Sequence, residues 1–184
     1  MKIYIDNWRW EGVPFYIRTG KRLPTNVSEV VIHFRPSPQK LFKQVDESTH
    51  SDNQLILRIQ PDEGILLKTG MKVPGNGYEV KSVNMDFHYS ELNDHYFPSA
   101  YERLILDCMS GDNMLYMQGE AVEETWKFVQ PILDYWENDP EAPLHGYPSG
   151  SWGPDVADGL IEGEENTWRY PCKNLAEDGV YCEL

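Results

Sequence analysis

The chain has 184 residues, of which 30 are acidic and 16 basic, so its formal net charge is −14. This length favours a single domain, and the negative charge argues against nucleic acid as a partner, because a phosphate backbone would be repelled. No apolar run reaches the roughly 20 residues that a membrane-spanning helix needs, so no membrane partner is expected. The cysteines at positions 108, 172 and 182 are odd in number and widely spaced, which favours reduced thiols over a disulfide framework.

The charges are divided unevenly along the chain. Residues 1–75 hold 11 Lys or Arg against 8 Asp or Glu, whereas residues 76–184 hold 5 against 22. A molecule with this polarity can attract an anion to its basic part. The acidic part is expected to be a solvated helical surface.

The first half of the chain predicts β-strands. A short aromatic run at 14–18 is followed by segments in which apolar and polar side chains alternate, at 27–35, 55–60, 65–73 and 78–89. In the segment 55–60, the side that carries Ile56, Arg58 and Gln60 is predicted to be the wetter one. Short turns separate most of these strands, and parallel strands need longer crossovers, so the sheet is predicted to be mainly antiparallel.

The pattern changes after residue 98. Ser99 can cap a helix that runs to Ser110 and stops at Gly111. A second helix begins near Glu120 and is expected to kink at Pro131. From residue 139 onward we expect irregular structure held on the sheet by two tryptophans, Trp152 and Trp168. The predicted fold class is therefore α+β, with a large antiparallel sheet and helices packed on one side of it.

Most signatures of catalysis are missing. The chain has no glycine-rich strand-to-helix loop, no Walker loop, no HExxH and no cysteine pairs at zinc spacing. We therefore expect no catalytic, cofactor-binding or metal-ligating residue and no Rossmann domain. The five histidines are scattered without a recognisable base and orienting partner, and His33 and His88 are expected to be ordinary hydrogen-bonded strand residues.

One segment has the chemistry of an anion site. Residues 18–22 place three cations and a glycine directly after the aromatic run: Arg18, Gly20, Lys21 and Arg22 around Thr19. Glycine lets the backbone approach an anion, and lysine supplies a compact charge on a long stem. A phosphate site and a solvated basic turn explain this spacing equally well. Gln60 and Arg58 could line the same concavity, although a surface amide is the simpler interpretation of Gln60.

Five blocks of the chain closely resemble the glucose-6-phosphate dehydrogenase family, in family order: residues 8–23, 28–34, 57–64, 100–107 and 147–154. The resemblance implies that residues 1–184 are the C-terminal domain of such an enzyme. It also implies that the NADP-binding Rossmann domain, with the catalytic histidine, is not in this chain.

The resemblance assigns substrate contacts to two residues, Lys21 and Gln60. Another basic family residue, five positions after the lysine, is replaced here by Asn26, which can donate a hydrogen bond but carries no charge. Some relatives bind a second, structural NADP with basic residues on these strands. Arg58 and Lys68 match two of those residues, whereas Val27 and Val31 replace others, so that site is expected to be absent.

For the intact enzyme, the resemblance implies oxidation of glucose 6-phosphate to 6-phosphogluconolactone with NADP, in the oxidative pentose phosphate pathway. It further implies a cytoplasmic homodimer or higher oligomer assembled through the sheet, and a fragment that is inactive alone. The alternative is a non-catalytic dimerisation or interaction module, which composition alone would favour.

Overall fold

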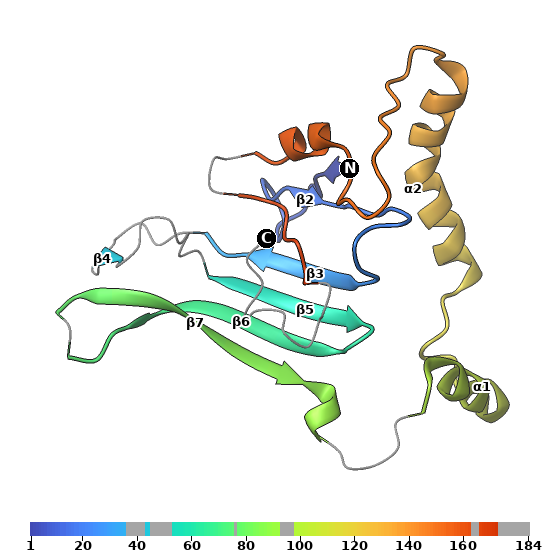
Figure 1. Ribbon diagram of the computed structural model, residues 1–184. Helices are drawn as coiled ribbons and strands as arrows, with labels where there is room; N and C mark the ends of the chain where they lie inside the picture. Colours follow the sequence, from blue (N-terminus) through green and yellow to red (C-terminus); the bar gives the residue numbers. More distant parts are fainter. Residues whose placement is uncertain (36–42, 45–52, 76, 93–97, 163–165, 173–184) are drawn as a thin grey trace. The chain divides into compact units, whose positions relative to one another are not determined.

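The computed structural model describes residues 1–35, 43–44, 53–75, 77–92, 98–162 and 166–172 (Figure 1). The chain divides into two compact units. One comprises Met1–Asn93 together with Gly146–Leu184, and the other is Asp94–His145. All the strands lie in the first unit, and both α-helices lie in the second.

A five-stranded sheet is the main element of the first unit. Its order is β3 (Ser28–His33), β5 (Gln54–Gln60), β6 (Gly64–Lys72), β7 (Glu79–His88) and β4 (Lys43–Gln44). The first four strands pair antiparallel, and the two-residue β4 joins β7 in parallel. The predicted antiparallel sheet and its hairpins are confirmed, with strand ends within two residues of those expected. Most of the long connection before β5 lies outside the described residues.

The aromatic run does not belong to this sheet. It forms β2 (Phe15–Tyr16), which pairs with β1 (Lys2–Ile3) in a separate two-stranded sheet. The Ile17 amide donates a hydrogen bond to the Met1 carbonyl oxygen, and the Met1 amino group donates one to the Ile17 carbonyl oxygen. The first residues of the chain thus supply hydrogen-bond partners for the backbone at the end of β2. The prediction of one sheet is therefore wrong at its first strand.

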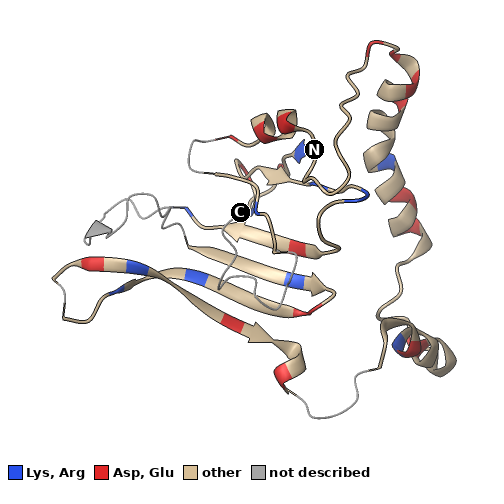
Figure 2. Ribbon diagram, in the orientation of Figure 1, with Lys and Arg blue, Asp and Glu red and all other residues tan. Residues whose placement is uncertain are grey.

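The second unit holds α1 (Ala100–Ser110) and α2 (Gly119–Asn138). Ser99 and Glu102 form a reciprocal capping box, and Gly111 ends α1 with a left-handed φ of 72°. Helix α2 continues through Pro131. Its acidic residues, which are coloured red on the ribbon of Figure 2, are exposed, as expected for the acidic half of the chain. The packing of both helices on one side of the sheet stays a prediction.

The part of the first unit that begins at Gly146, which we call the tail, is only partly irregular. A 3-10 helix, η2 (Asp155–Leu160), follows Pro154, and a shorter one, η1 (Tyr89–Leu92), follows β7. The two tryptophans of the tail lie close to Arg18, next to the small sheet, rather than on the large sheet as expected. No helix in the described part of the chain has the length and apolar character needed to cross a membrane.

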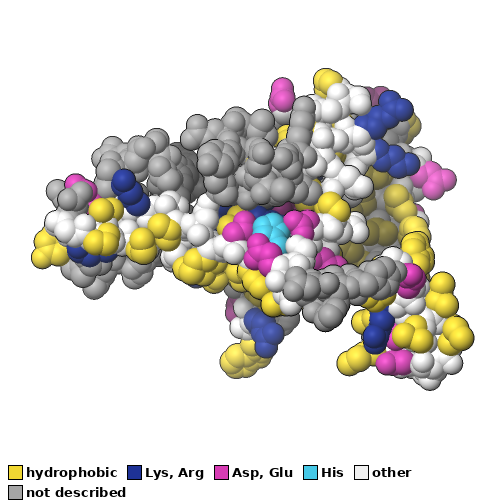
Figure 3. All heavy atoms as spheres, turned by 60° about the horizontal axis from the view of Figure 1, so that its bottom comes forward, with side chains coloured by type: hydrophobic (Ala, Val, Ile, Leu, Met, Phe, Trp, Pro, Cys, Tyr) yellow, Lys and Arg dark blue, Asp and Glu magenta, His cyan; other side chains and the backbone are white. Residues whose placement is uncertain are grey.

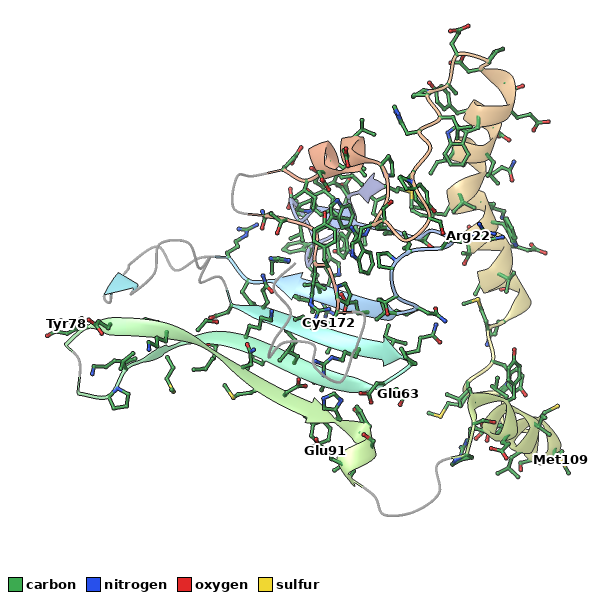
Figure 4. All side chains as sticks on the ribbon, in the orientation of Figure 1. Arg22, Glu63, Tyr78, Glu91, Met109 and Cys172 are labelled. Atoms are coloured by element: carbon green, nitrogen blue, oxygen red, sulfur yellow. The ribbon has the colours of Figure 1, made fainter. Side chains whose placement is uncertain are left out.

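The two faces of the large sheet differ in burial, in the opposite sense to the prediction. Ile56 and Leu66 are fully buried and Arg58 is only 6 % exposed, so the face expected to be wetter is the covered one. The segment before residue 173 lies over it, because Arg169 forms an ion pair with Glu29 of β3 and Cys172 is fully buried (Figure 4).

The other face, which we name the apolar face, carries large apolar side chains in register across four strands. Several of them are more than a third exposed. Its members are Val30, Ile32, Leu55, Leu57, Ile59, Ile65, Leu67, Met71, Val83, Met85 and Phe87.

The expectation of reduced thiols is correct for only one of the two cysteines that are described. Cys108 is free and exposed, but Cys172 is disulfide-bonded. The remaining cysteine, at position 182, lies outside the described residues. A disulfide requires a Cα separation of about 4.4–6.8 Å, and sequence spacing does not reveal which cysteines the fold brings that close.

Gly64 provides a test of the hairpin between β5 and β6. A Cβ atom there would lie 2.4 Å from the backbone oxygen of Phe87, which the sheet holds in place. We expect Gly64→Ala to lower the free energy of unfolding by about 1–3 kcal/mol, as overpacking usually does. Urea denaturation measures this. Gly119→Ala, where nothing lies within 4 Å, is the control and should be neutral or stabilising.

Candidate functional site

The basic segment 18–22 follows β2, but its first cation is not available to a ligand. The Arg18 guanidinium lies 5.0 Å from the ring centroid of Trp152, 4.7 Å from that of Trp168 and 5.0 Å from that of Tyr170. It also donates a 2.7 Å hydrogen bond to the Arg169 carbonyl oxygen. Arg18 is therefore a structural anchor between β2 and the tail.

Residues 20–22 are held by a second part of the tail. The Tyr147 hydroxyl donates a 2.8 Å hydrogen bond to the Lys21 carbonyl oxygen, and the Gly150 amide donates one of 2.8 Å to the Arg22 carbonyl oxygen. A Cβ atom on Gly20 would lie 2.9 Å from the Tyr147 oxygen. Arg22 has a φ of 58°, an uncommon value for a residue with a side chain. Two tail residues thus hold the two consecutive carbonyl groups that follow the Lys21 Cα atom.

The Lys21 side chain itself is exposed. Within the described residues, no carboxylate forms an ion pair with its ammonium group. Arg22, labelled in Figure 4, is the next cation and is also exposed. A fixed main chain under a solvated ammonium group is suited to receiving an anion.

Gln60 lies at the end of β5. It is exposed, and its Nε2 atom donates a 3.0 Å hydrogen bond to the Ser28 hydroxyl at the start of β3. Ser28 is seven residues after Lys21, so the start of β3 connects the two predicted substrate contacts. No hydrogen bond between the Lys21 and Gln60 side chains occurs among the described residues.

Arg58 is not a neighbour of Gln60 in an open concavity, as the sequence suggested. Its side chain is buried on the covered face and forms a bidentate ion pair with Asp86, with distances of 2.5 Å to Oδ1 and 3.0 Å to Oδ2. The sequence could not show this, because Asp86 comes from β7, two strands away in the sheet.

His88 extends this network from buried Arg58 toward the surface. Its Nδ1 atom is 2.8 Å from Asp62 Oδ2, and its Nε2 atom is 3.3 Å from Arg58 Nη1. Figure 3 shows a histidine surrounded by acidic side chains on this part of the surface. The sequence analysis missed this histidine–carboxylate pair. The register of β6 and β7 could have revealed it, because it pairs His88 with Gly64, two residues after Asp62. Because both ring nitrogens are engaged, His88 is the ordinary hydrogen-bonded residue that was expected.

Asp86 responds to two opposing effects. Partial burial raises the pKa of its carboxyl group, but the hydrogen bonds and positive charge of Arg58 outweigh burial and hold that pKa below its usual value. A carboxyl group with a lowered pKa in the folded state stabilises the fold above its unfolded pKa. That stabilisation is lost as the pH falls through the folded pKa.

Asp86→Asn tests this network. We expect it to lower the free energy of unfolding at pH 7 by about 2–4 kcal/mol, because it removes the carboxylate charge that the buried Arg58 guanidinium binds through two nitrogens. The wild type should lose stability from about pH 5 downward, and the variant should lose less over that interval. Urea denaturation at several pH values measures both effects. Asp6→Asn, at an exposed carboxylate, should change stability by less than about 0.5 kcal/mol; equal losses in the two variants would contradict the assignment.

Comparisons with known proteins agree with this geometry. Residues 1–169 match the family model described as glucose-6-phosphate dehydrogenase, C-terminal domain. Two curated relatives are named glucose-6-phosphate 1-dehydrogenase. The one from Treponema pallidum (strain Nichols) is 51% identical over 185 residues, covering 100% of this chain and 36% of the relative. The one from Aggregatibacter actinomycetemcomitans is 50% identical over 171 residues, covering 93% and 33%.

Two solved structures have a similar fold. A glucose-6-phosphate 1-dehydrogenase from Mycobacterium avium aligns with a TM-score of 0.73 at 35% identity, over 94% of this chain and 35% of that one. A glucose-6-phosphate dehydrogenase in complex with its substrate glucose 6-phosphate aligns with a TM-score of 0.77 at 33% identity, over 92% and 34%.

The chain thus spans about a third of the length of these relatives. The family match covers both sheets, both helices and most of the segment that anchors residues 18–22, since it ends one residue before Tyr170. The chain belongs to the C-terminal domain family of glucose-6-phosphate dehydrogenase.

Proposed function

We propose that this chain forms the substrate-contacting and dimerisation part of a glucose-6-phosphate dehydrogenase. The intact enzyme oxidises glucose 6-phosphate to 6-phosphogluconolactone with NADP in the oxidative pentose phosphate pathway of the cytoplasm. The observation that carries the proposal is the Lys21 ammonium group, exposed above a main chain that the tail holds fixed. Family membership supplies the substrate class.

In this proposal, Lys21 and Gln60 bind and orient the sugar phosphate. The ammonium group complements the phosphate charge, and the Gln60 amide offers a donor and an acceptor to sugar hydroxyls. Both residues lower the cost of holding the sugar in a reactive position. The proton and the hydride leave through groups outside this chain.

NADP accepts the hydride in such an enzyme, and the resemblance assigns its binding mainly to the Rossmann domain rather than to this chain. Arg58, the strand cation that resemblance assigns to a second NADP, is already neutralised by Asp86 on the covered face. This pairing supports the absence of a second NADP site on these strands.

Lys21→Met tests the substrate contact. In the dehydrogenase that carries this chain, we expect the KM for glucose 6-phosphate to rise about tenfold or more, because a charge-assisted hydrogen bond is lost. The kcat should change much less. Steady-state kinetics measures both. Lys81→Met, at an exposed lysine on β7, is the control. An unchanged KM in Lys21→Met would favour the non-catalytic interaction module instead.

The isolated chain should be inactive. We expect the purified 184-residue protein, mixed with glucose 6-phosphate and NADP, to produce no NADPH, because none of the proposed hydride or proton acceptors belongs to it. Absorbance of NADPH measures the turnover. Sustained turnover by this chain alone would refute the division of labour.

We further propose that the apolar face binds a second copy of the chain. Ile59 is 53% and Met85 is 55% exposed there, within a continuous patch over four strands. Burial of apolar surface favours association by about 25 cal/mol per Å² of area removed from water. The patch belongs to the sheet that the resemblance assigns to dimerisation.

Met85→Lys tests this surface. We expect it to convert the dimer to a monomer, because a charge would be buried without a partner. Sedimentation at matched concentrations measures the oligomeric state. Ser82→Lys places the same charge on the opposite side of β7 and should leave the dimer intact. Dimers that survive Met85→Lys would show that another surface is used.

A further inference from the structure

We infer that Tyr147 is a positioning residue for Lys21, acting through the hydrogen bond of its hydroxyl group to the Lys21 main chain. This inference rests on the proposed function of Lys21. Tyr147 lies 126 residues further along the chain and is half-buried, so its hydroxyl reaches Lys21 only in the folded protein.

The Tyr147 hydroxyl contacts both Lys21 and Gly20. It donates a hydrogen bond of 2.8 Å to the Lys21 carbonyl oxygen. The neighbouring Gly20 leaves just enough space for the hydroxyl, since a Cβ atom at position 20 would lie 2.9 Å from the hydroxyl oxygen. Glycine at position 20 therefore permits the approach of Tyr147. The Tyr147 hydroxyl therefore packs closely against Gly20 and is hydrogen-bonded to Lys21.

The other anchors of the segment do not act on Lys21 directly. The three aromatic rings around Arg18 act three residues earlier. The Gly150 amide binds the Arg22 carbonyl oxygen, one peptide later. Between these anchors, the orientation of the Lys21 peptide depends on Tyr147. Because the peptide orientation sets the direction of the side chain, the hydroxyl restricts the region that the ammonium group can occupy.

Loss of the hydroxyl should therefore weaken substrate binding without blocking the reaction. The Lys21 charge remains, but it must be ordered when the phosphate binds, and ordering a long side chain costs affinity. A single neutral hydrogen bond of this kind corresponds to about a three- to tenfold change in a binding constant.

The experiment is Tyr147→Phe in the dehydrogenase that carries this chain. We expect the KM for glucose 6-phosphate to rise about three- to tenfold while kcat stays within about twofold. Tyr116→Phe is the matched control, since the Tyr116 hydroxyl also donates to a main-chain oxygen, that of Leu104. It should leave the KM unchanged even if thermal stability falls. A KM that is equally raised in both variants would overturn the inference.

A double-mutant cycle with Lys21→Met separates positioning from direct contact. Once the ammonium group is gone, Tyr147→Phe should raise the KM no further. An undiminished second rise would mean that the hydroxyl acts independently of Lys21, which overturns the inference. A normal KM in Tyr147→Phe beside a raised KM in Lys21→Met overturns it but leaves the proposed function intact. A normal KM in Lys21→Met refutes both.

Gly20→Ala is a second route to the same contact. The added methyl group should displace the Tyr147 hydroxyl and raise the KM about as much as Tyr147→Phe does. In the Tyr147→Phe background, where the oxygen is already absent, Gly20→Ala should have a smaller effect. An additive effect in that background contradicts the assignment.

Discussion

The contact on which the first unit depends is the stacking of the Arg18 guanidinium among Trp152, Trp168 and Tyr170. Each contact of this type contributes about 0.5–2 kcal/mol, and the bond to the Arg169 carbonyl oxygen fixes the direction of the guanidinium group. The contact joins the residues after β2 to the tail, more than 130 positions later. Other links join the tail to Lys21, Arg22 and β3, and Glu162 of the tail contacts Lys2, Tyr4 and Tyr16 of the small sheet region.

The cations of the first unit differ in how far the fold engages their side chains. Arg18 is caged by aromatic rings, and Arg58 and Arg169 are neutralised by Asp86 and Glu29. A buried or stacked arginine suits this role because its planar group makes several directed contacts at once. Lys21 stays in solvent, where its compact charge can meet an anion. The surrounding fold thus restrains the main chain of Lys21 and leaves its side chain exposed.

The large sheet separates the same two tasks by face. One face is closed by the tail and by the Arg58–Asp86–His88–Asp62 network. A polar network of this kind tolerates burial because each charge has a partner. On the apolar face, several large side chains remain more than a third exposed among the described residues. Apolar residues on neighbouring strands lie opposite one another there. The two faces of the large sheet therefore differ in character, one covered and polar in part and the other apolar.

The sequence by itself determined the local elements: alternation gave β3, β5, β6 and β7, and Ser99 and Gly111 delimited α1, because these signals act between near neighbours. The assignment of Lys21 and Gln60 to substrate contact comes from resemblance rather than spacing and stays a prediction. Only the tertiary structure decided which sheet face is covered, that β2 leaves the large sheet, and that Arg58 and Arg18 are occupied. Those outcomes depend on Asp86, Trp168 and other residues far along the chain, and sequence periodicity does not encode which distant groups meet.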